Sequence, residues 1–373
     1  MKKNDTVIIG ASAAGLACAA CLKEENLEFI LLEQHAHVAH AWRNHYDRLH
    51  LHTNKSSSDL PYFSYPKSFP KYPSRDQVVA YLELYAKEMG IQPVFNTKVT
   101  SIEKADEGWV IKTNKGTYLA KYVIVCTGHT HKPHIPWKEG IESFPGRIMH
   151  SAEYKNGREF KDRDVLVVGF GNSACEIAIC IHEHGGRPAL SVRSAVNVIP
   201  RDVLGIPSLQ IGILQSRLPA KLADRLNQPV IDLLIGDIQK LGLKKPAYGP
   251  IEQMRKYHKI PLLDIGTIRL IKEGKIKVFP DIKAIEQDVI HFEDHRQQHF
   301  DAIIMATGYE AGLSDFIKID KHRLKDLEKP FRHREEAGKD NLYFCGFYVS
   351  PTGMLREVGI EARKIAKRIK KSA

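Results

Sequence analysis

Two glycine-rich turns, each set between a short apolar strand and a helix, constrain the fold of this chain more than any other feature. The first turn spans Gly10–Gly15, after the strand-like run Thr6–Ile9 and before the helical run Leu16–Leu22. A second apolar run, Phe29–Leu32, then leads directly into Glu33. This order of strand, turn, helix, strand and acid is typical of a nucleotide-binding βαβ unit.

The residue types in this turn fit that interpretation. Gly10 permits a tight turn and Gly15 permits close packing of helix on strand, while the helix N-terminus faces a pyrophosphate. Ser12 stands where a middle glycine is usual, and its small side chain still lets the backbone approach a ligand. An acid at Glu33 can bind a ribose hydroxyl and favours a nucleotide without a 2′-phosphate, such as FAD. The predicted FAD contacts here are Gly10, Ser12, Ala13, Ala14, Gly15 and Glu33.

The same pattern recurs later in the chain. The strand-like run Val165–Val168 precedes Gly169–Ala174, which reads G-x-G-x-x-A, and the helical run Cys175–Ile181 follows. The next strand-like run, Ala189–Val192, ends at Arg193, whose guanidinium suits a 2′-phosphate and therefore NADP(H). The predicted contacts are Gly169, Gly171, Asn172, Ser173 and Ala174 for the pyrophosphate, and Arg193 with Ser194 for the 2′-phosphate.

The length and order of these elements predict the domain organisation. A chain of 373 residues exceeds one ordinary core, which favours two domains. Two further strands end in Thr-Gly, at Thr127-Gly128 and Thr307-Gly308, and each follows a predicted hairpin. We expect an α/β fold of two nested dinucleotide-binding, Rossmann-like domains. The FAD domain is predicted over 1–150 and 280–373, and the NADPH domain that interrupts it over 158–279, with a helical insert at about 207–243.

The C-terminal part of the chain is predicted to complete the FAD domain. Asn341–Gly346 reads as its last strand, and a helix from about Gly353 would point its N-terminus toward the flavin. The run Arg363–Lys371 is strongly basic, in a chain of net charge +11. We interpret this run as the solvated end of an amphipathic helix, because cations are favoured at a helix C-terminus and no nucleic-acid motif accompanies it.

Composition excludes several classes of protein. With 43% hydrophobic residues the chain has enough apolar material for large cores, which excludes a mostly disordered protein. The longest apolar runs have the length of strands and fall short of the ~18 residues that span a bilayer. No apolar run follows the first lysines directly as a signal peptide would require, so we expect a cytoplasmic protein.

The six cysteines all lie in apolar segments, which suits buried, reduced thiols. Cys18 and Cys21 form a C-x-x-C, which is also the spacing of redox-active disulfides. They lie inside a helical run, however, and we favour packing in a helix as their role. No cysteine and histidine cluster has the spacing of a zinc site, so no metal is predicted.

Further segments resemble the flavin-containing monooxygenases, and most closely the YUCCA-type enzymes of plants, which oxidise indole-3-pyruvate. Phe144–Tyr154 fits the family's F-x-G-x-x-x-H-x-x-x-(W/Y/F) linker signature, and Ala306–Tyr309 resembles its A-T-G-Y strand end. The likeness extends over nearly the whole chain, through Trp42 and the segments Tyr46–His52, Phe69–Pro73, Val192–Arg201, Leu262–Gly266 and Gly274–Val278.

This resemblance implies an NADPH-dependent FAD monooxygenase. NADPH would reduce FAD, the reduced flavin would add oxygen at C4a, and the peroxyflavin would oxygenate a small organic substrate, either a 2-oxo acid such as indole-3-pyruvate or a sulfide or amine. The protein would keep this site dry, because water promotes loss of hydrogen peroxide. Further cofactor contacts are expected at Trp42, Thr53, Asn54, Thr127, Gly128, Thr307, Gly308 and Gly346.

Two residues are candidate catalytic residues by resemblance. Many monooxygenases of the wider family place an asparagine beside the flavin, and Asn54 is the candidate here. His150 belongs to the linker signature and is a candidate contact of NADPH. The chain departs from the family pattern at Ser12, at Ala174 and at Asn54-Lys55, where YUCCA-type enzymes usually have Pro-Lys. These departures leave the substrate open.

Two other functions remain as alternatives. A disulfide or quinone reductase on the same fold would need a dithiol such as Cys18 and Cys21, or an acceptor site at the flavin. A flavin-binding redox sensor would have no turnover. The insert Pro207–Leu243 fits a packed helical insert, a lid over the substrate, or a surface that meets a membrane. The expected partners are a small-molecule substrate and molecular oxygen, with no nucleic acid and no stable membrane span, and a homodimer is left open.

Overall fold

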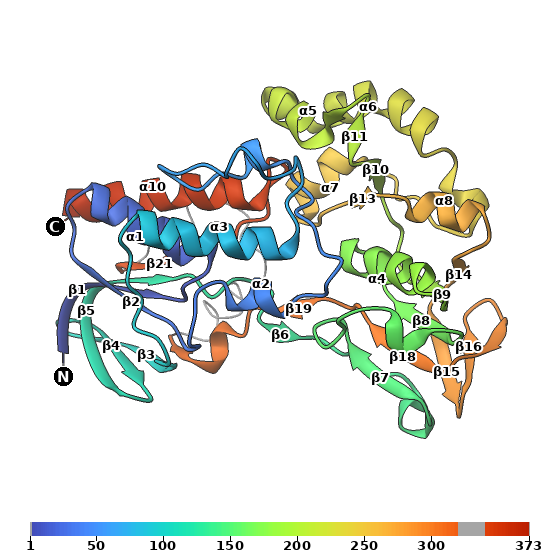
Figure 1. The fold of residues 1–373 in the computed structure, drawn as a ribbon, viewed down its shortest axis with the longest axis horizontal. Coiled ribbons are helices and arrows are strands. Elements are labelled where there is room, and N and C mark those ends of the chain that lie inside the picture. The colour runs from blue at the N-terminus through green and yellow to red at the C-terminus, as the bar shows by residue number, and fades with distance from the viewer. Residues whose placement is uncertain (1, 320–339, 373) are drawn as a thin grey trace. The chain divides into compact units, whose positions relative to one another are not determined.

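The computed structural model describes residues 2–319 and 340–372, and the chain forms two compact units (Figure 1). Unit 1 comprises Met1–Asn44, Thr53–Lys132 and Tyr309–Ala373. Unit 2 comprises His45–His52 and Pro133–Gly308. Each unit contains one of the two predicted fingerprint turns.

Unit 1 is built on a sheet whose strands follow the order β2-β1-β5-β4-β3-β20, with β21 also beside β5. The long strand β5 pairs antiparallel with β4 over its first half and parallel with β21 over its last residues. Apolar residues occupy the parallel strands almost continuously, as expected for strands buried on both faces. The strands are β1 (Lys2–Ile9), β2 (Phe29–Leu32), β3 (Val99–Ala105), β4 (Gly108–Thr113), β5 (Gly116–Val125), β20 (Ile317–Lys318) and β21 (Leu342–Phe344).

Three helices, α1 (Ala13–Glu24), α3 (Arg75–Glu88) and α10 (Met354–Ser372), lie side by side along one face of this sheet (Figure 1). In α10, Val358, Ala362, Ile365 and Ile369 are buried, while the lysines and arginines of its last turns are exposed. The basic C-terminal run is therefore the solvated face of an amphipathic helix, as predicted. The predicted first hairpin, last strand and C-terminal helix of this unit are likewise confirmed.

Unit 2 is built on a parallel sheet of order β14-β9-β8-β18-β7. Its strands are β7 (Arg147–His150), β8 (Asp164–Val168), β9 (Arg187–Ser191), β14 (Lys277–Phe279) and β18 (Ala302–Met305), and α4 (Asn172–Glu183) connects β8 to β9. The second predicted hairpin forms part of a small antiparallel sheet of β15 (Ile282–Glu286), β16 (Val289–Phe292) and β17 (Gln297–His299).

The bounds of the units differ from the domains drawn from the sequence. Residues 133–150 and 280–308, predicted in the FAD domain, lie in unit 2, because β18 pairs with β8 and also with β7. Residues 45–52, which were also predicted in the FAD domain, pack in unit 2 as well. These differences arise from contacts between segments far apart in the sequence, which local patterns do not encode.

The segment predicted as a helical insert contains helices in the structure, and its helical elements continue to residue 257. It contains β11 (Asp202–Val203), β12 (Ile206–Pro207), α5 (Ser208–Leu214), α6 (Ala220–Leu234) and α7 (Pro250–Tyr257). Strands β10 (Val198–Pro200) and β13 (Leu262–Asp264) pair beneath it. The other elements are α2 (His40–Asn44), α8 (Thr267–Lys272), β6 (Lys132–Pro133), β19 (Tyr309–Glu310) and the 3₁₀ turns Lys55–Ser57, Ile141–Ser143, Arg158–Phe160, Gln215–Arg217, Ile238–Leu241 and Leu313–Asp315. Within the described ranges, no helix has the length and apolarity needed to cross a membrane.

Candidate functional site

The first fingerprint turn lies where β1 ends and α1 begins, and its two glycines are sterically required. Gly10 has φ of +99°, and a Cβ there would lie 2.9 Å from the carbonyl oxygen of Cys126. A Cβ on Gly15 would lie 1.8 Å from the carbonyl oxygen of Gly10. Ser12 is the N-cap of α1, but its side chain makes no capping hydrogen bond. The amides at this helix N-terminus are thus left for an anion, which the helix dipole favours.

Glu33 lies beside this turn at the end of β2 and is buried. Its Oε2 accepts a hydrogen bond from the Ala11 amide at 2.7 Å, and its Oε1 accepts one from the His35 amide at 2.9 Å. A carboxylate oxygen has two lone pairs, so each oxygen keeps capacity for a second donor. The carboxylate is therefore fixed in place and chemically suited to bind the two hydroxyls of a ribose.

Three histidines follow Glu33 and form a compact cluster. The rings of His35 and His40 stack at a centroid distance of 3.2 Å, and His40 Nδ1 lies 3.3 Å from His37 Nε2. Burial lowers the pKa of His40 to about 4, and the nearby charges of His35 and His37 act in the same direction. His40 is therefore neutral in the folded protein near neutral pH.

We expect this cluster to make the protein less stable in mild acid. An unfolded histidine titrates near pH 6.5, so between that pH and about 4 the unfolded chain binds a proton at His40 that the folded chain does not. Stability therefore falls as the pH decreases through this window. The melting temperature measured from pH 7 to pH 5 should fall more for the wild type than for His40→Gln. Parallel curves for the two proteins would contradict this role.

The ends of β5 and β21 meet the fingerprint turn at the same edge of the sheet. The Thr127 Oγ1 is buried and has no hydrogen-bond partner among the described residues. Gly346 has φ of +86°, and a Cβ there would lie 3.2 Å from the Cβ of Ala14. Gly128 also has positive φ, with open space around its Cβ position. Carboxyl ends of parallel strands are where α/β sheets bind ligands, so the structure brings Gly10, Thr127 and Gly346 together at the expected place.

Asn54 occupies a buried position in unit 1, with 2% of its surface exposed. Its Nδ2 donates to Ser56 Oγ at 2.7 Å and to Ser57 Oγ at 3.1 Å. Its Oδ1 is buried and has no partner among the described residues, an arrangement that costs about 1–3 kcal/mol unless a ligand donor satisfies it. Thr53 instead bonds Ser58, with 2.7 Å between the two Oγ atoms, and Trp42 lies partly buried on α2.

The segment just before Asn54 is anchored in unit 2 by a buried carboxylate that the sequence analysis missed. His52 Nε2 lies 2.5 Å from Oε1 of Glu176, which is buried on α4. Arg48 forms two hydrogen bonds to Glu183, at 2.8 and 2.9 Å, and lies 3.5 Å from Glu176. The signal available in the sequence was the spacing of the two acids, which are seven residues apart and so share one helix face.

The second fingerprint turn repeats the geometry of the first at the start of α4. Gly169 has φ of +126°, and a Cβ there would lie 2.6 Å from the carbonyl oxygen of Ala306. Gly171, the N-cap of α4, is exposed and has open space around its Cβ position. Ser173 is partly buried and Ala174 fully buried. The Asn172 side chain is already engaged, because its Oδ1 accepts a hydrogen bond from the Leu263 amide at 3.0 Å.

Arg193 and Ser194 follow the carboxyl end of β9 and are exposed. Within the part of the chain that the structure describes, Arg193 forms no ion pair or hydrogen bond. An exposed guanidinium without a partner at the end of the second strand is available to bind a phosphate bidentately.

His150 is buried, and both of its ring nitrogens contact backbone groups. Its Nε2 donates to the Gly308 carbonyl oxygen at 3.0 Å, and its Nδ1 accepts from the Ala152 amide at 3.1 Å. Burial lowers its pKa, which favours the neutral ring that this pattern requires. Thr307 is engaged too, because its Oγ1 donates to the His134 carbonyl oxygen. These bonds favour a positioning role for His150, holding the linker to the end of β18, over a direct contact with NADPH.

All six cysteines lie in the described residues, and all are free and buried. Cys18 and Cys21 form no disulfide. The Sγ atom of Cys18 lies 3.9 Å from the Sγ atom of Cys126. Burial raises the pKa of Cys21 to about 11 and that of Cys126 well above its ordinary value. The packing interpretation is confirmed, and a redox-active dithiol at this position is not supported.

We expect the thiols to be unreactive in the native protein. The thiolate is the reactive form, and burial both suppresses it and blocks access. A chromogenic thiol reagent added to native protein should report almost no fast-reacting cysteine, and all six after denaturation. A fast-reacting pair that appears only after NADPH reduction would instead support the reductase alternative.

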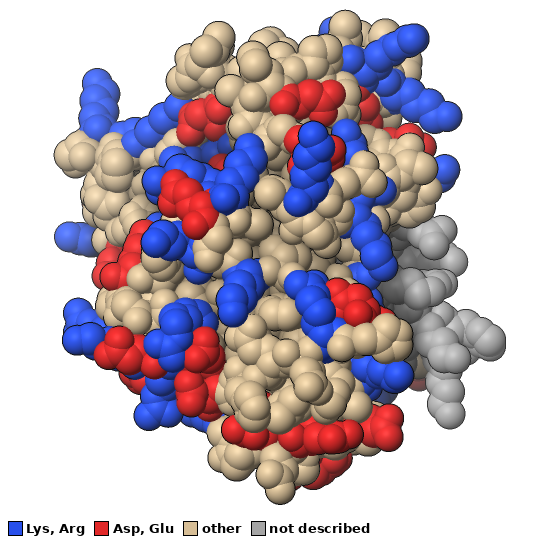
Figure 2. Space-filling model, turned by 90° about the vertical axis from the view of Figure 1, so that its right-hand side faces the viewer, with Lys and Arg blue, Asp and Glu red and all other residues tan. Residues whose placement is uncertain are grey.

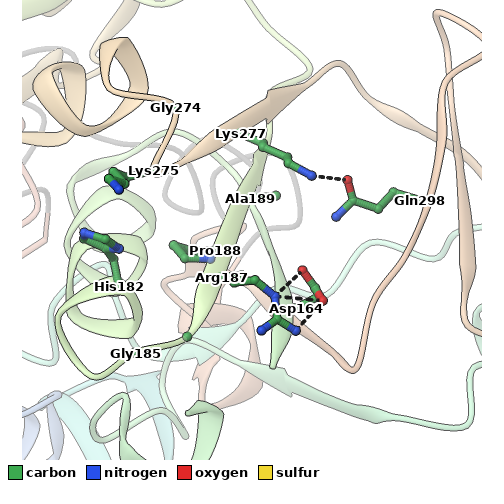
Figure 3. A pocket seen from close by; sticks show the side chains of 11 residues that line it. Asp164, His182, Gly185, Arg187, Pro188, Ala189, Gly274, Lys275, Lys277 and Gln298 are labelled. Atoms are coloured by element: carbon green, nitrogen blue, oxygen red, sulfur yellow. Dashed lines mark hydrogen bonds and ion pairs between the residues drawn. The ribbon is translucent and has the colours of Figure 1, made fainter. Parts of the chain in front are cut away.

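The cavity of about 350 Å³ in unit 2 is separate from these residues (Figure 3). Its lining includes Asp164, Arg187 and Lys277, which are the first residues of β8, β9 and β14. Figure 3 shows Arg187 turned toward Asp164 and Lys277 toward Gln298. The cavity therefore lies at the amino ends of the strands, whereas ligands of such sheets bind at the carboxyl ends. It is not the candidate nucleotide site.

The surface charge and the possible metal ligands were also considered across the described residues. The face seen in Figure 2 intersperses lysine and arginine with aspartate and glutamate, without a broad area of one sign. Among residues 2–319 and 340–372, no cluster of three or more histidine, cysteine or acidic side chains could hold a metal ion.

Comparisons with known proteins agree with the two nucleotide-binding turns described above. The model of the flavin-binding monooxygenase-like family matches residues 2–371. Indole-3-pyruvate monooxygenase YUCCA1 of Oryza sativa subsp. japonica is 37% identical over 91% of this chain and 86% of its own length. Indole-3-pyruvate monooxygenase YUCCA6 of Arabidopsis thaliana is 37% identical over 98% of this chain and 90% of its own length.

Solved structures show the same fold. A flavin-containing monooxygenase from Stenotrophomonas maltophilia superposes with a TM-score of 0.73 at 20% identity, covering 100% of this chain and 99% of its own. The bacillithiol disulfide reductase from Bacillus cereus gives 0.71 at 18% identity, with 100% of both chains covered. Both monooxygenases and reductases therefore use this architecture, and at this identity the likeness shows the fold alone.

Proposed function

This chain belongs to the flavin-binding monooxygenase-like family, and on that premise we propose that it uses FAD and NADPH to oxygenate a 2-oxo acid of the indole-3-pyruvate type. The observation that carries the substrate class is the 35–38% identity to relatives named indole-3-pyruvate monooxygenases, over more than nine-tenths of this chain. The alternatives are not favoured, because the matching family model and the relatives of 35–38% identity are those of monooxygenases.

The residues of each unit fit one cofactor. In unit 1, the open helix N-terminus after Gly10 would receive the pyrophosphate of FAD, and the fixed carboxylate of Glu33 would bind its ribose. In unit 2, the exposed backbone of Gly171 would receive the pyrophosphate of NADPH, and Arg193 its 2′-phosphate. NADPH supplies the hydride and FAD the ring system that activates oxygen. The other cofactor contacts named from the sequence are proposed with the same roles, with His150 as a positioning residue and Thr307 contacting the cofactor through its backbone.

Asn54 is the proposed polar contact of the flavin. Its buried, unpaired Oδ1 can accept a hydrogen bond from a ring N–H, while the two serines hold its amide in a fixed orientation. Water would be kept from this position by the burial of the side chain, which is the condition that oxygen transfer requires.

Replacing Asn54 with leucine should uncouple the reaction. The substitution keeps the shape of the side chain and removes its hydrogen bonds, so we expect product formed per NADPH to fall roughly tenfold, the effect of about 1.4 kcal/mol, while hydrogen peroxide rises. The control is Asn114→Leu, at an exposed asparagine of the same unit. Unchanged coupling in Asn54→Leu, measured by product and peroxide yields, would remove Asn54 from the site.

The substrate class is tested by turnover with a panel of candidates. A 2-oxo acid should lose its carboxyl group as carbon dioxide and become the acid one carbon shorter, with one oxygen atom of O2 in that acid and the other in water. We expect indole-3-pyruvate to stimulate NADPH consumption more than a sulfide or an amine does, with matching product. Faster turnover of a sulfide or amine would overturn the substrate class and leave the monooxygenase in place.

The partners and the location of the protein are supported to different degrees. A small-molecule substrate and molecular oxygen are the partners that a monooxygenase requires. The absence of a nucleic-acid partner, a cytoplasmic location and a homodimer are proposals that rest on the sequence. Light scattering of the purified protein decides the oligomeric state directly.

A further inference from the structure

The helical insert of unit 2 exposes a set of large aliphatic side chains. Leu222, Leu226, Val230 and Leu233 of α6 are exposed, and Leu233 shows 83% of its surface. Two more leucines project from neighbouring elements, Leu214 at the end of α5 with 83% exposed and Leu204 between β11 and β12 with 94% exposed. In Figure 1, α5, α6 and β11 lie together at the upper edge of unit 2. We call the six residues the leucine face.

The spacing on α6 places its four members on one side of the helix. They are separated by four, four and three residues, which on an α-helix forms a single stripe. Surface helices normally turn such a stripe toward the core. Here the stripe faces solvent, and the helix buries a different side.

Polar contacts hold the inner side of α6 against the rest of the insert, and the stripe therefore faces solvent. Asp224 is buried, and its two carboxylate oxygens accept hydrogen bonds from the Ile251 amide at 2.8 Å and the Glu252 amide at 2.9 Å, at the start of α7. Asn227 and Gln215 exchange two amide hydrogen bonds, at 2.8 and 2.9 Å. Rotating the stripe inward would break all four bonds and bury leucine in place of a satisfied carboxylate.

Cations border the leucine face. Arg217, Lys221 and Arg225 are exposed, and none of them forms an ion pair with any residue that the structure describes. Lys221 and Arg225 each directly precede a leucine of the stripe. Their charge is therefore uncompensated and available at the edge of the apolar surface.

We propose that the leucine face is a docking surface for an anionic lipid bilayer. A helix with an apolar stripe and adjacent lysine or arginine lies in the membrane interface, with the stripe in the acyl region and the cations among the head groups. The proposed contact is peripheral, because it is made by side chains that are exposed on the surface of the insert. This proposal is independent of the substrate.

The chemistry of the face favours lipid over a protein partner. Its six members are all leucine or valine, and no large exposed aromatic side chain lies among them. Energetically dominant residues of protein interfaces are mainly tryptophan, tyrosine and arginine, with leucine and valine under-represented and lysine depleted. Uncompensated Lys221, Arg217 and Arg225 instead complement anionic head groups.

The test is flotation of the FAD-loaded full chain with vesicles of phosphatidylcholine containing about 30% phosphatidylserine, and of phosphatidylcholine alone. We expect binding to the anionic vesicles that weakens in high salt. The variant Leu222→Gln/Leu226→Gln/Leu233→Gln should bind at least about tenfold more weakly, because each side chain loses its transfer from water to lipid. Its melting temperature and its NADPH oxidation without lipid should match the wild type, since all three side chains are exposed.

Two further variants separate the parts of the proposal. Ile135→Gln/Ile260→Gln removes aliphatic side chains that are 47% and 46% exposed outside the face, and should bind vesicles as the wild type does. Lys221→Gln/Arg225→Gln should lose the preference for phosphatidylserine. The proposal is overturned by a wild type that does not float. It is also overturned if the triple variant is a monomer where the wild type is a dimer, because the face would then be an interface between two copies of the chain. A rise in the triple variant's KM for the organic substrate in the absence of lipid would overturn it too, because the face would then cover the substrate site.

Discussion

Gly15→Ala is expected to produce a protein without bound flavin. The added Cβ would lie 1.8 Å from the Gly10 carbonyl oxygen, a backbone atom that cannot move without displacing α1 from β1. The displacement removes the helix N-terminus from the position where the pyrophosphate binds. The flavin absorbance of the purified protein, and its recovery on adding FAD, measure this loss.

The matched control is Gly171→Ala in the second fingerprint turn. Gly171 has φ of −88° and no atom within 4 Å of its Cβ position, so alanine fits without strain. We expect this variant to keep its fold and its flavin and to raise the KM for NADPH, because the methyl group stands where the backbone meets the pyrophosphate. A Gly15→Ala protein with full flavin content would contradict the account of the first turn.

Arg193→Ala is expected to abolish the preference for NADPH over NADH. The exposed guanidinium has no partner among the described residues, so its charge is free for the 2′-phosphate. A hydrogen bond to a charged group contributes about 1.5–3 kcal/mol, which corresponds to a roughly 10- to 100-fold rise in the KM for NADPH. The KM for NADH, which lacks that phosphate, should change little.

Arg187 offers the control for this prediction. It is also an exposed arginine of β9, but it lies at the amino end of the strand and pairs with Asp164 at 2.7 Å. Arg187→Ala should leave the ratio of the two KM values unchanged. If Arg193→Ala retained the wild-type ratio, another residue would read the phosphate.

Local patterns predicted much of this fold. Both fingerprint turns, both hairpins, the last strand and the C-terminal helix form where the sequence indicated, because each depends on glycines, periodicity and caps within a short window. The bounds of the two units could not be predicted as well from the sequence. They depend on β18 pairing with β8, and the sequence does not encode such a register locally.

The candidate site likewise has a part that the sequence predicts and a part that it does not. The glycines and Glu33 follow from one βαβ pattern, whereas the His52–Glu176 contact joins residues 124 positions apart. Asn172 and His150 were predicted to contact NADPH, and these contacts stay predictions. Their bonds to the Leu263 amide and the Gly308 carbonyl oxygen join distant segments and could not be read from the sequence. Chemistry of a residue type can be read locally, while its actual partners depend on tertiary packing.

The measurement that tests the central claim most directly is turnover of indole-3-pyruvate under ¹⁸O2 with NADPH. The account predicts one ¹⁸O atom in the carboxyl group of the shortened acid, with one NADPH and one O2 consumed per product. Product without ¹⁸O, or NADPH oxidation that yields only hydrogen peroxide or a reduced disulfide with every candidate substrate, would contradict the assignment as a monooxygenase.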